Sequence, residues 1–208
     1  MKSIVMGTNT LVVLGAWNIA IFTPEWVKNN ILLENQEARV LVPMNIGCSL
    51  RFETDFYSFF IEGERLSFTI NKEEDSSYVF VIQTLRNIIQ KLPHTPVRAL
   101  GTNFVFKKDT KFEVLENMDD SDKLKSVVDI VGNSVTSQAL VRKFKLTDIE
   151  DLNLKIEEDP QKGSFLDFNF NYNLKSTEDI LNLIGEDNNL LLNNKALAND
   201  ISNNVYGE

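Results

Sequence analysis

Apolar and polar residues alternate most regularly in the stretch L-D-F-N-F-N-Y-N-L, which runs from Leu166 to Leu174. Because successive side chains of a strand point to opposite faces of its sheet, this segment has one aromatic face and one face of short polar side chains. Such a pattern is typical of a half-buried strand in an antiparallel sheet. We expect the aromatic face to pack in the core, closed by the helix that follows the strand.

Shorter runs of the same alternation predict the other strands, and glycine, proline and charged turns give their limits. The segment Glu62-Gly63-Glu64 is one such turn, because it is charged and contains glycine at the tip of a predicted hairpin. The expected strands cover residues 10–17, 39–43, 50–61, 65–71, 97–106, 138–147, 152–158 and 164–174.

Three segments carry the signals of helix starts. Thr23-Pro24-Glu25 supplies an N-cap, a proline at the first helical position and an acid in the first turn, so a short helix is expected to follow. Asp75-Ser76-Ser77 is expected to cap an amphipathic helix that ends near Leu92. Ser176-Thr177-Glu178-Asp179 is expected to cap a terminal helix that Gly185 kinks or splits.

These elements predict an α+β fold, mainly an antiparallel sheet with helices packed on one face. Three strands followed by a helix occur twice, at about residues 39–92 and 138–205, so we expect two pseudo-duplicated halves. We treat residues 1–208 as a single α+β domain. The stretch 107–136 is a candidate seam between the halves, because charged clusters interrupt its apolar pattern.

The net charge of the chain makes some classes of binding partner less favourable than others. The chain of 208 residues has a formal net charge of -9, which disfavours binding to nucleic acid or to anionic lipid through electrostatic attraction. An acidic surface is compatible with three alternatives: solubility alone, a basic protein partner, or mimicry of a nucleic acid. The 14 phenylalanines have no polar group, so we expect most of them in the core.

Single copies of cysteine and histidine restrict the chemistry further. With Cys48 alone the chain has no internal disulfide and no cysteine-based zinc site, and with His94 alone it has no histidine pair. The first residues lack the continuous apolar run of a secretory signal, and no stretch is long and apolar enough to span a membrane. We therefore expect a cytoplasmic protein of bacterial or viral type, with no membrane association.

No nucleotide-binding glycine motif occurs in the chain, and we expect no cofactor and no metal. The acidic cluster Asp119-Asp120-Ser121-Asp122 lacks the spacing, glycine and terminal glutamate of an EF-hand loop. Clusters of this kind are ordinarily solvated loops. We name no catalytic residue, and a hydrolase using Asp109 or Asp167 is kept as a third alternative.

Three places are candidate binding sites, each with a plainer alternative. The polar face of the strand at 164–174 either faces water or recognises a partner through amide hydrogen bonds. The aromatic segment near residues 17–26 either covers the core or forms a binding lip. The histidine between two prolines either stiffens a turn or acts in a site. The candidate residues are Asp167, Asn169, Asn171, Asn173, Trp17, Phe22, Trp26 and His94.

We therefore expect a non-catalytic protein-interaction module, acting as an accessory subunit, an adaptor or an inhibitor or immunity-type partner. The partner is another protein or a second copy of the chain, with strand edges as candidate interfaces. The second alternative is a small apolar-ligand binder with a cavity between sheet and terminal helix. The third is the acid- or metal-dependent hydrolase, and the fourth is an acidic mimic of nucleic acid.

Overall fold

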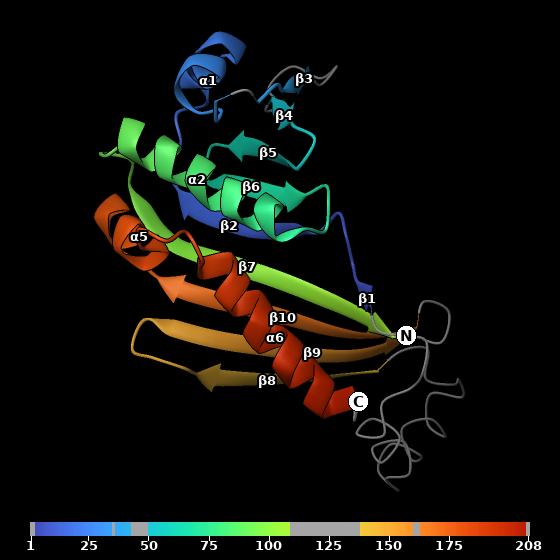
Figure 1. Ribbon diagram of the computed structural model, residues 1–208. Coiled ribbons are helices and arrows are strands. Elements are labelled where there is room, and N and C mark those ends of the chain that lie inside the picture. The colour runs from blue at the N-terminus through green and yellow to red at the C-terminus, as the bar shows by residue number, and fades with distance from the viewer. Residues whose placement is uncertain (1–2, 35, 43–49, 109–137, 160–162, 207–208) are drawn as a thin grey trace, which may run out of the picture.

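The computed structural model describes residues 3–34, 36–42, 50–108, 138–159 and 163–206 (Figure 1). They form one ten-stranded antiparallel sheet with helices on one face, which confirms the predicted fold class. The strands are β1 (Ser3–Ile4), β2 (Asn9–Gly15), β3 (Arg39–Leu41), β4 (Arg51–Glu53), β5 (Tyr57–Glu62), β6 (Arg65–Ile70), β7 (Val97–Lys108), β8 (Gln138–Lys145), β9 (Glu150–Asp159) and β10 (Gly163–Asn173). The helices are α1 (Pro24–Asn30), α2 (Asp75–Lys91), α5 (Thr177–Ile184) and α6 (Leu190–Tyr206), with a 3-10 turn at Ile19–Ile21.

The strand order has the same arrangement on both sides of the middle of the sheet. It runs β3-β4-β5-β6-β2-β7-β10-β9-β8, with β1 added beside β7. In the first half, β2 pairs with the last strand of the β4-β5-β6 meander; in the second half, β7 pairs with the last strand of the β8-β9-β10 meander. The two halves meet where β2 pairs with β7. This order agrees with the predicted pseudo-duplication, whereas the superposition of the halves stays a prediction.

The core lies between the sheet and the helices α2, α5 and α6, which lie in front of the sheet in Figure 1. Helix α2 packs on β5 and β6, α6 packs on β7 and β10, and α2 contacts both α5 and α6. The aromatic side of β10 is buried there, as predicted, through Leu166, Phe168, Phe170 and Tyr172. Burying side chains of this size contributes about 2 kcal/mol each.

Local sequence signals explain two of the helix starts. The Thr23 hydroxyl accepts a hydrogen bond from the backbone N–H of Trp26, so Thr23 is the N-cap of α1 as predicted. Ser176 and Asp179 form a reciprocal capping box at the start of α5. Gly185, with φ of 58°, ends α5, so the predicted terminal helix is split into α5 and α6.

Two details of the sequence prediction were wrong. The N-cap of α2 is Glu74 rather than a residue of the Asp75-Ser76-Ser77 segment, and its side chain makes no capping hydrogen bond. The expected strand at residues 50–61 is two strands, β4 and β5. The Thr54 hydroxyl accepts hydrogen bonds from the backbone N–H groups of Phe56 and Tyr57, which turns the chain there.

A buried polar network joins α6 to the sheet. The Asn194 amide donates hydrogen bonds of 2.8 Å to both the Thr102 hydroxyl on β7 and the Tyr172 hydroxyl on β10. Tyr172 in turn donates to the Glu150 carboxylate at 2.7 Å. Burial, reinforced by the hydrogen bond to Glu150, raises the pKa of Tyr172 well above its usual value, so the hydroxyl is protonated at neutral pH.

We predict that Asn194→Ala lowers the free energy of unfolding by about 2–3 kcal/mol, because two buried hydrogen bonds are lost. Asn193→Ala is the matched control, since Asn193 is exposed on the same helix and the change in helix propensity is the same. Urea denaturation of both variants measures the difference. Equal stability of the two variants would show that the network contributes nothing.

Candidate binding surfaces

Among the described residues, no helix covers the second face of the sheet, which we call the open face (Figure 1). In the first half of the sheet, arginine side chains lie across it. Arg51 on β4 donates a 2.8 Å hydrogen bond to the Ser58 hydroxyl, and Arg65 donates a 2.7 Å bond to the Ser67 hydroxyl. Both serines are buried beneath these side chains.

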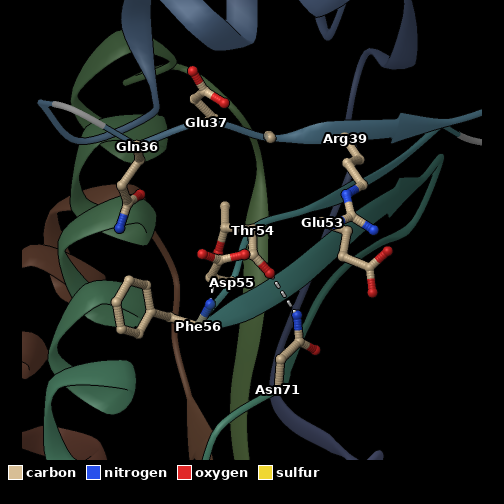
Figure 2. A pocket seen from close by; sticks show the side chains of 9 residues that line it. Gln36, Glu37, Arg39, Glu53, Thr54, Asp55, Phe56 and Asn71 are labelled. Carbon is tan, nitrogen blue, oxygen red and sulfur yellow. Dashed lines mark hydrogen bonds between the residues drawn. The ribbon is translucent and has the colours of Figure 1, made fainter.

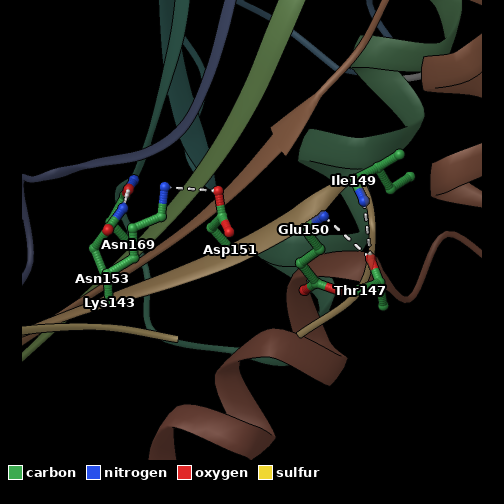
Figure 3. Close-up of polar contacts among 7 residues, drawn as sticks. All are labelled: Lys143, Thr147, Ile149, Glu150, Asp151, Asn153 and Asn169. Carbon is green, nitrogen blue, oxygen red and sulfur yellow. Dashed lines mark hydrogen bonds and ion pairs between the residues drawn. The ribbon is translucent and has the colours of Figure 1, made fainter. Parts of the chain in front are cut away.

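An asparagine ladder crosses the open face in the second half of the sheet. The register places Asn103 on β7 and Asn153 on β9 directly opposite Asn169 on β10. Asn169 donates to the Asn103 side chain at 2.7 Å and accepts from the Asn153 side chain at 2.9 Å, the latter bond drawn in Figure 3. The Asn103 amide then donates to the Asn9 carbonyl at 2.7 Å. Asn169 is therefore engaged on both sides within the sheet.

The other predicted residues of this strand also lie on the open face. Asp167 and Asn171 are half-buried, and Asn173 at the end of the strand is exposed. Burial raises the pKa of the Asp167 carboxyl; the Lys155 ammonium lowers it and the Glu157 carboxylate raises it again. The structure thus groups the four predicted residues on one surface, and their role in binding stays a prediction.

The aromatic segment and the histidine lie elsewhere. Trp17 and Phe22 are buried and Trp26 is half-buried, and the three rings pack edge to face in a row. This burial supports the packing alternative for Trp17 and Phe22. His94 is exposed in the turn between α2 and β7, far along the chain from the predicted strand residues. Binding through these four residues stays a prediction, and Cys48, Asp109 and Asp119 lie outside the described residues.

Two hollows border the end of the sheet at β3 and β4. One, of about 560 Å³, is polar, and in it the Asn71 amide donates a 2.9 Å hydrogen bond to the Thr54 carbonyl (Figure 2). The other, of about 860 Å³, lies between α1 and the first strands and includes the apolar side chains of Leu32, Val40 and Phe52. From the sequence we expected a ligand cavity under the terminal helix. Both of these hollows lie instead beside β3 and β4, at the other edge of the sheet.

The edge strand β8 is a surface that the sequence analysis did not single out. Nine large apolar side chains are exposed among the described residues, and four of them lie in β8 and the turn after it: Val141, Phe144, Leu146 and Ile149, exposed by 59, 46, 40 and 49%. Alternation predicted β8 as a strand but did not show that it ends the sheet. Only the order of the strands shows this.

The turn after β8 is held by local hydrogen bonds. The Thr147 hydroxyl accepts from the backbone N–H groups of Ile149 and Glu150, at 3.3 and 3.1 Å (Figure 3). The Lys143 ammonium lies 2.9 Å from the Asp151 carboxylate on the neighbouring strand, also drawn in Figure 3. The exposed apolar residues therefore stand on a well-defined hairpin.

In the part of the chain that the structure describes, no group of three or more His, Cys, Asp or Glu side chains is arranged to hold a metal. None of the described helices combines the length and apolar character needed to cross a membrane. No family model matches the chain, and neither a curated protein nor a solved structure matches it.

We predict that Asn169→Ala lowers the free energy of unfolding by about 1–2 kcal/mol, because two inter-strand hydrogen bonds are lost at a half-buried position. Asn171→Ala on the same strand and face is the control. Its side chain makes no hydrogen bond with the described residues, so a change within about 0.5 kcal/mol is expected. Urea denaturation compares them; an equal loss in both variants would contradict the ladder's role.

We predict that Asp167→Asn stabilises the protein at neutral pH. A carboxyl whose pKa is raised by folding is less favourably ionised in the folded state, so the wild type loses stability as pH rises above about 4, the unfolded value. The melting temperature of Asp167→Asn should therefore exceed that of the wild type at pH 7. The difference should vanish near pH 3, where the carboxyl is protonated in both states.

Thermal melts across this pH range measure the effect. Asp55→Asn controls for the loss of one negative charge, because Asp55 is exposed in the β4–β5 turn. An Asp167→Asn protein that is equally or less stable than the wild type at pH 7 would contradict the prediction.

Proposed function

We propose that the chain is a non-catalytic protein-interaction module of the cytoplasm, which binds a partner through the β8 edge and the adjoining open face. The observation that carries this proposal is the gathering of exposed apolar side chains along the β8 edge and its turn, with Val141 on the open face and Phe144 on the helix face of the same strand. Single exposed apolar residues are ordinary, whereas a cluster of them commonly marks an interface. An accessory subunit, an adaptor or an inhibitor would each use such a surface.

The geometry of the open face is compatible with the proposal. Lysine and acidic side chains alternate across β8, β9 and β10 beside the apolar Val141, which resembles the polar rim of a protein interface. The second alternative, an apolar ligand, finds support in the hollow beside α1. That hollow is also lined by Glu25, Lys28 and Glu37, so its lining is mixed rather than apolar.

A photoreactive phenylalanine analogue placed at two exposed apolar positions tests the proposal. Phe144 lies on β8, and Leu197, exposed by 40%, lies on α6 in the helix layer and is the matched control. We expect irradiation of native cells to join a defined protein to the chain at Phe144 and not at Leu197. The purified partner should then bind the unmodified chain in solution.

Competition by excess unlabelled protein separates a specific product from background. Identical products at both positions, or no product at Phe144 that the competitor removes, would contradict a binding function at this edge.

A further inference from the structure

Among the described residues, no strand pairs with the backbone groups along the outer side of β8. The Leu146 N–H donates a 3.0 Å hydrogen bond to the Glu150 carbonyl of the neighbouring strand. Because residues alternate in an antiparallel ladder, the even-numbered residues of β8 bond to β9 and Val141, Lys143 and Lys145 direct their N–H and C=O groups outward. Within the described residues no strand lies beyond β8. The exposed Arg142 side chain makes a 3.4 Å contact with the Val141 carbonyl, which an incoming strand would replace.

The side chains of β8 are basic, in contrast to the chain as a whole. The strand Q-A-L-V-R-K-F-K carries Arg142, Lys143 and Lys145 and no acid, whereas the net charge of the chain is -9. Lys143 and Lys145 pair with Asp151 and Asp148, but their side chains remain 63 and 67% exposed. The Lys145–Asp148 pair is exposed on both sides and contributes little, so Lys145 can exchange its partner at small cost. Asp151 is only 18% exposed, so Lys143 would contact an acidic partner while still paired with Asp151.

This charge disfavours pairing of the edge with a second copy of the chain. Two β8 strands side by side would bring three positive charges against three, and like charges on neighbouring strands are destabilising. The opposite edge of the sheet, β3, carries Arg39 and no acid, so a head-to-tail contact of β8 with β3 also opposes like charges. Charge complementarity therefore favours an acidic partner strand.

We propose that β8 binds an extended, acidic segment of another protein, which adds to the sheet as a further strand. The proposal rests on the protein-interaction function above and names the chemistry of the partner. Acidic side chains would lie beside Lys143 and Lys145 on the open face, and apolar side chains would lie on the opposite face, beside Phe144. Backbone hydrogen bonds would supply affinity, and the alternating side chains would supply specificity.

Two synthetic peptides as long as β8 test the proposal, one of alternating Glu and Val and one of alternating Lys and Val. We expect the Glu peptide to bind, with its largest effects on the amide resonances of Val141, Lys143 and Lys145, and the Lys peptide not to bind. Val141→Pro should abolish binding and keep the fold, because the missing N–H faces outward and edge strands tolerate such a proline. Circular dichroism confirms that the variant is folded.

A second variant tests the proposal without introducing a proline into β8. The double substitution Lys143→Glu with Lys145→Glu should lower the affinity for the Glu peptide by roughly tenfold or more, because favourable cross-strand charge pairs become repulsive. The same substitution should let the Lys peptide bind, because its charges are then opposite to those of β8. Equal binding of both peptides to the wild type, no binding of either, or a Glu peptide that binds folded Val141→Pro unchanged would overturn strand addition. A specific cross-link at Phe144 together with any of these results would leave the interaction function intact and reject only the acidic strand.

Discussion

The antiparallel pairing of β2 with β7 joins the two halves of the sheet, and the rest of the structure depends on it. On the helix side of this pair, Leu11 lies opposite Thr102 and Val13 lies opposite Leu100, all of them buried. At its end the strands approach so closely that a Cβ on Gly15 would lie 2.6 Å from the Pro96 carbonyl oxygen. Glycine is needed there because any side chain would displace the backbone of β2 from β7.

The helices of the two halves are also joined to each other, above the pairing of β2 with β7. Arg86 of α2 donates hydrogen bonds to the Asn188 side chain and to the Gly185 carbonyl, in the connection between α5 and α6. At the other end of α2, the Lys195 ammonium of α6 lies 2.8 Å from the Glu73 carboxylate and 4.4 Å from the centre of the Tyr78 ring. Helix α2 of the first half is thus joined directly to the helices of the second half. All of these contacts lie on one face, and none of the described helices packs on the opposite face.

The sequence predicted the features that depend on neighbours along the chain. Alternation in β10 gave the correct buried face, since the period of a strand assigns Phe168 and Phe170 to one side regardless of its neighbours. The asparagine ladder was not predictable in this way. It needs Asn103, Asn153 and Asn169 to lie directly opposite one another, and that register depends on the pairing of β10 both with its neighbour β9 and with β7, which is distant in sequence. The break at Thr54 was missed for a related reason, because a hydroxyl that bonds to its own turn leaves the apolar pattern almost unchanged.

The same reasoning separates the two surfaces of the second half. The Asn169 side chain already donates and accepts a hydrogen bond within the ladder. Fewer of its hydrogen-bonding groups can therefore bind a partner than an asparagine side chain ordinarily offers. At β8 the situation is reversed, because no described strand pairs with its outer side and the side chains of Lys143 and Lys145 are largely exposed. Over distances longer than about 8 Å, salt screens the net charge of the whole chain, so a partner close to β8 is affected mainly by the basic side chains of that strand. The acidity of the chain as a whole is therefore compatible with a basic edge that selects an acidic strand.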